Sequence, residues 1–359
     1  MSFIQFPNLF GGVTLYIERV AFRLFGIPIF WYGLLIAFGF ALSLILAGAS
    51  ARKFKINKDD LYDIILFSAP VAIVCARLFY VIFDWQTFKG NIGAIFDFRQ
   101  GGLAIYGAVI GAFVTGYFVS KKKKLIPLRI FDFAAPYFAL SQSIGRWGNF
   151  VNQEAFGVNT NLPWGMTGDR ISSYLRSRQN DLAAQGIIVN PDLPVHPTFL
   201  YESLWNFAAF FLLIWLRKNK KLDGEVFFGY MFLYGLGRSW IEGLRTDSLM
   251  LGSFRISQLL AVLFVLVFGA LFVIRRKKLP HLIQSEFYDP DYVFPEITES
   301  KKEEKKDKSE YSDLVQVIKG QSEEKTTDDD SNPDEEEDVE EQESEDLNEK
   351  AEDESSIHE

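Results

Sequence analysis

The sequence predicts an all-α membrane protein, a bundle of seven transmembrane helices followed by a disordered acidic tail. Hydrophobic residues make up 48% of the chain and are concentrated in seven apolar stretches. Each stretch has about 18 to 23 residues and can cross a hydrocarbon core of about 30 Å as a helix. Short basic clusters follow alternate stretches, and acidic residues collect at the C-terminus. A single acidic globular domain is therefore excluded, although the net charge of the chain is −9.

Residues 1–28 precede the apolar stretches. They contain neither a basic beginning nor an uninterrupted apolar core, so they do not have the pattern of a cleavable signal peptide. Aromatic residues recur among polar ones, which indicates an arm on the outer membrane interface. A seven-span domain is expected over residues 29–278, with spans near 29–50, 61–83, 102–120, 130–150, 199–216, 225–243 and 256–274.

Basic residues set the expected orientation, because short cytoplasmic loops retain an excess of Lys and Arg. The N-terminus is expected outside and the C-terminus in the cytoplasm, with a large outer loop over residues 151–198. The basic clusters follow the first, third, fifth and seventh spans and contain Arg52, Lys53, Lys55 and Lys58, the lysines at 121–124 with Arg129, Arg217, Lys218, Lys220 and Lys221, and the run 275–278.

The last segment, residues 279–359, differs in composition from the rest. From His281 onward there are 8 Lys and Arg against 30 Asp and Glu, a net charge of −22, whereas the preceding 280 residues carry +13. Low-complexity acidic sequence cannot bury enough apolar surface to fold, so we expect a disordered cytoplasmic tail. It is either a solvated segment or a docking segment for a basic protein partner. The basic body is not a nucleic-acid binder, because its charges lie in short clusters between apolar runs.

Polar residues of the predicted spans gather at one depth. Charges inside a membrane are costly and therefore point to function. The predicted topology puts them in the outer half, whereas an ion pathway would need them through the whole thickness. The sequence thus predicts a site that faces the outer leaflet, and its candidates are Tyr32, Arg77, Tyr106, Arg146, Glu202 and Arg238, with His196 just before the fifth span.

Two arginines on inward helix faces suit a phosphate diester, because guanidinium is always charged and can grip two oxygens at once. The alternative is that these arginines snorkel, form interhelical ion pairs, or form pairs such as Arg238 with Glu242. The two faces follow from spacings of three and four residues. They consist of Gln142, Arg146 and Asn149 on the fourth span and of Tyr230, Tyr234, Arg238 and Glu242 on the sixth.

The segment 145–157, GRWGNFVNQEAFG, resembles the signature GRxGNFxNxExxG of bacterial prolipoprotein diacylglyceryl transferases. Further blocks agree in order: FWYGLLIAFG around Tyr32, ARLFYVIF around Arg77, then GGLAIYG, HPTFLYES and YGLGR. The resemblance covers roughly residues 20–278 and not the acidic tail.

The resemblance implies a seven-span enzyme of the plasma membrane. It moves the diacylglyceryl group of phosphatidylglycerol to a cysteine thiol in the lipobox of a prolipoprotein signal peptide. Glycerol phosphate is released in this first step of bacterial lipoprotein maturation. In the family, the arginine of GRxGN and the arginine after YG hold the headgroup, here Arg146 and Arg238. We assign catalysis to Tyr106, Arg238 and Glu154, and substrate binding to Arg146, Asn149, Tyr32, Gly157, Tyr234, Glu242, Arg77 and His196.

One position departs from the family pattern. Most members have a histidine in a motif of the form GGxxxHG, where this chain has Tyr106. Tyrosine, with a reference pKa near ~10, is a poor acceptor for a thiol proton. Tyr106 therefore either donates a hydrogen bond that positions lipid or phosphate, or another group takes the proton. His196, Glu154, Glu202 and Glu242 are the candidate bases.

No cofactor is expected, because His, Cys and acidic residues show no metal-ligand spacing. The single cysteine, Cys75, excludes a disulfide framework and a Cys-based zinc site. The rival interpretation is a transporter or a lipid-binding scaffold without enzymatic activity. Transporters usually contain internal repeats and polar sites near the midplane, whereas the polar layer here is one-sided.

Overall fold

The computed structural model describes residues 2–54, 56–90, 92–96, 101–248, 250–251 and 254–277. The chain divides into two units, Met1–Tyr292 and Val293–Glu359, and every described residue belongs to the first. The predicted acidic tail, residues 279–359, lies outside the described residues.

The described part of the chain is mostly helical, and a long helix lies at each predicted span. By length and composition, four of these helices can cross a membrane: α1 with the short helix that follows it, α2, α7 and α9. The long helices are α1 (Trp31–Ala51), α2 (Lys58–Phe83), α4 (Ile105–Lys122), α5 (Pro127–Asn152), α7 (Thr198–Lys218), α8 (Glu225–Leu244) and α9 (Ile256–Lys277).

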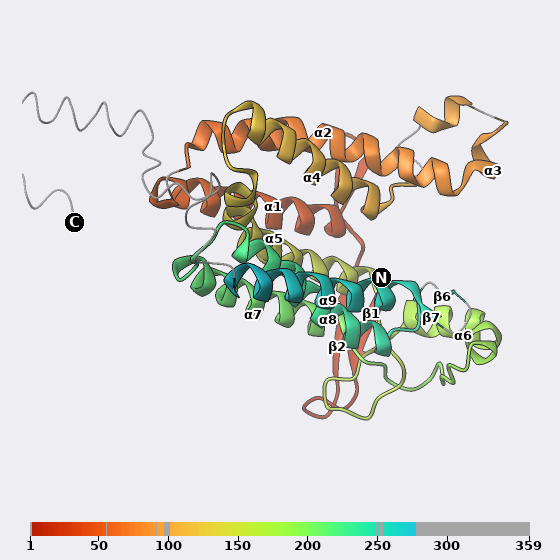
Figure 1. Cartoon of the computed structure of the whole chain (residues 1–359). Coiled ribbons are helices and arrows are strands. Elements are labelled where there is room, and N and C mark those ends of the chain that lie inside the picture. The colour runs from red at the N-terminus through yellow and green to blue at the C-terminus, as the bar shows by residue number, and fades with distance from the viewer. Residues whose placement is uncertain are drawn as a thin grey trace, which may run out of the picture. The chain divides into compact units, whose positions relative to one another are not determined.

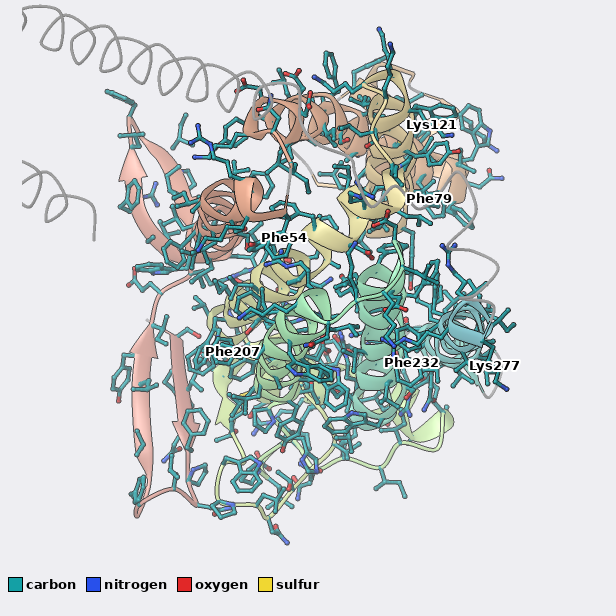
Figure 2. The ribbon with its side chains drawn as sticks, turned by 60° about the vertical axis from the view of Figure 1, so that its left-hand side comes forward. Phe54, Phe79, Lys121, Phe207, Phe232 and Lys277 are labelled. Atoms are coloured by element: carbon teal, nitrogen blue, oxygen red, sulfur yellow. The ribbon has the colours of Figure 1, made fainter. Side chains whose placement is uncertain are left out.

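Helix α5 is the central element of the bundle. It packs against α1 on one side and against α7 and α8 on the other, while α9 covers α8 (Figure 1). Phe232 lies between α8 and α9 (Figure 2), where a Cβ on Gly269 would be 3.2 Å from its ring. Many apolar side chains instead face outward, as Phe207 does on α7 with 46% exposure (Figure 2). Such exposed apolar surface suits contact with lipid.

Helices α2 and α4 form a close pair at the edge of the bundle (Figure 1). Glycines on α4 permit this contact, since a Cβ on Gly107 would collide with the Cys75 carbonyl and one on Gly111 would lie 2.8 Å from the Cys75 sulfur. Cys75 is thus a packed residue at a helix interface. The segment between the two helices includes α3 (Trp85–Phe88) and a 3₁₀ helix, Ile92–Phe96.

A buried ionic network fixes the start of α8. Asp132 of α5 is 1% exposed and accepts hydrogen bonds from the backbone N–H groups of Gly224 and Phe227, both at 2.8 Å. Lys220 reaches Asp132 at 2.9 Å and Asp223 at 2.7 Å. The carboxylate of Asp132 therefore satisfies N–H groups that a helix start leaves without intrahelical partners. This contact sets the position of α8 relative to α5.

The prediction of an all-α protein is wrong at the N-terminus. Residues 2–30 form two antiparallel hairpins, β1 (Ser2–Phe6) with β2 (Val13–Ile17) and β3 (Val20–Leu24) with β4 (Ile27–Phe30). Glycines allow both tight connections, because Gly11 and Gly12 have φ of 83° and 106° and Gly26 has φ of 83°. Phe10 and Phe25, at the hairpin tips, are 93% and 96% exposed.

The predicted outer loop, residues 151–198, is a folded segment with its own core. It contains β5 (Thr167–Gly168) and α6 (Asp169–Ala184), and β5 pairs with β1. Its core joins both ends of the segment to α5, α7 and the first hairpin. The buried residues are Ile4, Phe150, Phe156, Met166, Ile171, Leu175, Leu182, Val189, Val195 and Phe199. This layer fixes the junction where α5 ends and α7 begins. Two further short strands, β6 (Met250–Leu251) and β7 (Phe254–Arg255), precede α9.

Candidate functional site

Helix α5 ends inside the GRWGNFVNQEAFG segment, and the local sequence explains how. Gln153 adopts the left-handed conformation with φ of 56°, and its N–H bonds to the Phe150 carbonyl. The Gln153 amide then donates to the Ser2 hydroxyl at 2.7 Å and to Asp169 at 3.0 Å. The end of α5 is thus tied to β1 and α6. These bonds hold in place the last part of the helix, which includes Arg146.

Arg146 and Arg238 meet on one carboxylate. Nη2 of Arg146 lies 2.6 Å from Oε2 of Glu202, and Nη1 of Arg238 lies 2.8 Å from Oε1 of the same side chain. Nη2 of Arg238 lies 2.7 Å from Oε2 of Glu242, one helical turn further along α8. The structure therefore contains the interhelical ion pairs that were the alternative to a lipid-binding role, and it also brings the two arginines together.

A third arginine completes this group, and sequence reasoning did not single it out. Nη1 of Arg245 lies 3.6 Å from Oε1 of Glu202 and 4.0 Å from Oε2 of Glu242. Its Nε and Nη2 donate to Asp247 at 2.9 and 2.8 Å. Burial lowers the pKa of Arg245, but Asp247, Glu202 and Glu242 outweigh this effect and raise it, so Arg245 stays charged. We call Arg146, Glu202, Arg238, Glu242 and Arg245 the arginine cluster.

The arginine cluster is half-buried and rich in positive charge. The two carboxylates are almost fully buried, with 5% and 2% of their side chains exposed, whereas Arg146 and Arg238 keep 25% and 16%. Three cations against two anions leave one positive charge inside the cluster, and Asp247 balances it at the rim with 28% exposure. Guanidinium groups that remain partly accessible beside buried carboxylates can receive an anionic ligand.

Gly157, the last glycine of the segment, brings Arg245 to the cluster. It forms a bridge with Arg245, and a Cβ on it would lie 2.8 Å from the Leu244 carbonyl oxygen and 2.9 Å from the His196 Cβ. Val158 donates its N–H to that same Leu244 carbonyl. Gly157 therefore allows the backbone of the folded segment 151–198 to approach the end of α8 closely.

Four further predicted residues lie around the cluster. Asn149 accepts a long hydrogen bond of 3.5 Å from Arg146. Tyr234 lies one turn before Arg238 on α8 and interacts electrostatically with Arg146, Arg238, Glu202 and Tyr106. Tyr32 packs on the segment itself, because a Cβ on Gly148 would lie 2.6 Å from its ring. Tyr32 and Tyr106 are 38% and 47% exposed, so both phenols are accessible.

His196 and Glu154 belong to the folded segment 151–198. Nδ1 of His196 is 3.0 Å from the Tyr201 hydroxyl, which accepts a hydrogen bond from Trp164. Burial lowers the pKa of His196, so its imidazole is neutral near pH 7 and can accept a proton. Glu154 is half exposed and lies 3.7 Å from Arg19. Within the described residues, no ion pair or hydrogen bond joins Glu154 or His196 to the arginine cluster, and their predicted roles stay predictions.

Arg77 holds the turn that precedes Tyr106. The side chain is 5% exposed and donates to the carbonyls of Ala94, Ile95, Gly101 and Gly102 at 2.7 to 2.9 Å. Gly101 and Gly102 have positive φ of 82° and 75°, as this turn requires. These contacts make Arg77 an anchor for the start of α4, and its predicted contact with lipid stays a prediction.

Comparison with known proteins supports the resemblance of the sequence motifs. The family model of prolipoprotein diacylglyceryl transferase matches residues 19–274. A protein of Finegoldia magna named phosphatidylglycerol–prolipoprotein diacylglyceryl transferase is 45% identical over 262 residues, which are 73% of this chain and 96% of that protein. Proteins of the same name from Clostridioides difficile and Bacillus mycoides are 44% and 42% identical, over 69% and 75% of this chain and 92% and 96% of their own length. The chain therefore belongs to the prolipoprotein diacylglyceryl transferase family.

Proposed function

We propose that the arginine cluster holds the phosphate of phosphatidylglycerol while its diacylglyceryl group passes to a prolipoprotein. The transferase activity accords with the family and with the names of its relatives. The observation that carries the assignment to a site is the meeting of Arg146 from α5 and Arg238 from α8 on Glu202. Two guanidinium groups held this close can bind two oxygens of one phosphate diester.

The reaction that we propose is a single displacement at the glyceryl carbon that bears the phosphate ester. The acceptor is the lipobox cysteine of a prolipoprotein signal peptide. Its thiol gives its proton to a general base, for which neutral His196 is one candidate, and the resulting thiolate is the nucleophile. A carbon–sulfur bond forms while the carbon–oxygen bond breaks, and the bonding electrons leave with glycerol phosphate. The leaving group gains negative charge, so Arg146 and Arg238 stabilise the transition state more than the bound lipid. Tyr106 positions the lipid by donating a hydrogen bond.

We infer that all seven long helices span the plasma membrane, with the N-terminus outside and the cluster facing the outer leaflet. Two features support this orientation. The last turns of α4, α7 and α9 carry basic residues, including Lys121, Arg217 and Arg275, as cytoplasmic ends do. The cluster lies toward the opposite end, because Glu202 is near the start of α7 and Arg146 near the end of α5. The acidic tail is then cytoplasmic, and its charge of −22 suits a basic protein partner.

A direct assay tests this function. The purified full-length chain is incubated with phosphatidylglycerol and a synthetic lipobox peptide, and the peptide mass is measured. We expect a gain of one diacylglyceryl group together with release of one glycerol phosphate. A matched peptide with serine in place of the cysteine should stay unmodified. An unchanged mass of the cysteine peptide, with an intact enzyme and accessible lipid, would contradict the proposed function.

A further inference from the structure

In the part of the chain that the structure describes, Glu202 is the one carboxylate that Arg146 and Arg238 share. It lies on α7, between α5 and α8, and only 5% of its side chain is exposed. Each of its oxygens contacts a different arginine: Oε2 contacts Arg146 of α5, and Oε1 contacts Arg238 of α8. Arg245 approaches Oε1 as well, at 3.6 Å. Glu202 thus has three cationic partners, two of which also contact Glu242 or Asp247.

The contacts of Glu202 with the two arginines resemble those that a phosphate diester would make in the same place. A diester also carries one negative charge and two unsubstituted oxygens, and the pairs of contacts at 2.6 and 2.8 Å are of the length that guanidinium makes with phosphate. Arg146 and Arg238 cannot give the same N–H groups to Glu202 and to phosphate at once. Lipid binding must therefore exchange one anion for the other.

We propose that Glu202 is a place-holder anion that occupies the phosphate position until phosphatidylglycerol takes over its two arginines. This inference rests on the proposed function. In the empty site, Glu202 keeps the two guanidinium groups in register. It also compensates their charge, because unpaired cations in a buried site are costly. After the reaction, return of the Glu202 carboxylate to the arginines displaces glycerol phosphate. Glu202 thus acts as an internal competitor that limits lipid affinity and speeds product release.

Glu242 differs from Glu202 in geometry and provides the matched comparison. It contacts Arg238 from the same helix, four residues away, at 2.7 Å, and reaches Arg245 only at 4.0 Å. It makes no contact with Arg146 within the described residues, so it does not bridge the two arginines. Replacing either glutamate by glutamine removes one negative charge beside Arg238. Only the change at Glu202 removes the bridge.

The experiment measures steady-state kinetics of purified full-length Glu202→Gln and Glu242→Gln with phosphatidylglycerol and a lipobox peptide, and inhibition by added glycerol phosphate. For Glu202→Gln we expect the KM for the lipid and the inhibition constant of glycerol phosphate each to fall at least about tenfold, with a lower kcat because product leaves slowly. For Glu242→Gln, which leaves the bridge between the two arginines in place, neither constant should fall. A residue that merely supports the fold predicts the opposite, a raised KM. An unchanged or raised KM in Glu202→Gln overturns the proposal.

Loss of Glu202 leaves buried cations unpaired and lowers the stability of the empty protein. Thermal unfolding with and without phosphatidylglycerol keeps the proposal testable in that case, because the lipid should raise the unfolding temperature of Glu202→Gln more than that of the wild type. A smaller rise contradicts it. The variant Arg146→Ala separates the two proposals. If Arg146→Ala stays fully active, the phosphate assignment fails; if it is inactive while Glu202→Gln binds lipid no better, only the place-holder role fails.

Discussion

The change Gly157→Ala tests whether the folded segment 151–198 positions Arg245 at the arginine cluster. The added Cβ would lie 2.8 Å from the Leu244 carbonyl oxygen, 2.9 Å from the His196 Cβ and 3.2 Å from the Thr198 Cγ2. None of these atoms is the far end of a flexible side chain. The backbone of Leu244 must therefore move, and Arg245, which is bridged to Gly157, moves with it.

Gly145 is the matched control in the same segment. A Cβ there meets only the Ile36 Cγ1, at the ordinary contact distance of 3.8 Å. Since Gly145 lies inside α5, alanine should be neutral or stabilise the helix by up to about 1 kcal/mol. Overpacking at Gly157 should cost about 1–3 kcal/mol of unfolding free energy. A shift of the catalytic groups by less than 1 Å lowers kcat/KM by roughly 10- to 100-fold.

The assay compares thermal unfolding in detergent and the rate of glycerol phosphate release for Gly145→Ala, Gly157→Ala and the wild type. We expect the wild type and Gly145→Ala to agree within about threefold in rate, and Gly157→Ala to be slower and less stable. Equal rates and equal unfolding temperatures for the two variants would refute the reasoning from close backbone approach.

Three other predictions concern single side chains. Tyr106→Phe should lower kcat/KM about tenfold, the contribution of one hydrogen bond to a charged group, without changing the pH profile of glycerol phosphate release; a changed profile would reveal an acid–base role. Burial lowers the pKa of Lys220, but Asp132 and Asp223 outweigh this effect and raise it above 10.5. The resulting stability is present at neutral pH and lost as the pH rises through that pKa. At pH 7, Lys220→Met should therefore lower the free energy of unfolding by about 3–5 kcal/mol. In thermal melts, the variant should lose less stability than the wild type at alkaline pH. Burial lowers the pKa of His196, which favours its neutral form, so stability should fall as the pH drops below 6.5, and His196→Gln should remove that acidic loss.

The positions of the long helices could be predicted because the length of an apolar stretch is a strong signal. The boundaries were less accurate, as α5 starts at Pro127 where the sequence predicted residue 130. A proline is favoured in the first turn of a helix, and this signal would have given the start. The two N-terminal hairpins were missed because their strands of four or five residues are too short for a clear alternation, although Gly11–Gly12 and Gly26 mark their turns.

The site could be predicted in part. Arg146 and Arg238 each lie three or four residues from other polar residues of the same span, which indicated inward helix faces. The structure brings both arginines to Glu202. Arg245 was missed because it follows the sixth span and reaches the site through its bridge to Gly157, a contact between segments distant in the sequence. Its spacing of three residues from Glu242 was the available signal. No pattern in the sequence distinguishes Glu202 as the shared partner, since that depends on how α5, α7 and α8 pack.

The most direct test of the phosphate assignment is single-turnover release of glycerol phosphate from phosphatidylglycerol by purified Arg146→Ala and Arg238→Ala. Each arginine should supply two charge-assisted hydrogen bonds worth about 1.5–3 kcal/mol apiece, so each variant should be slower by at least about 100-fold at saturating lipid. Arg146→Lys should recover only part of the rate, because an ammonium keeps the charge without the planar fork. Rates within about threefold of the wild type in both alanine variants, with folded protein, would contradict the account.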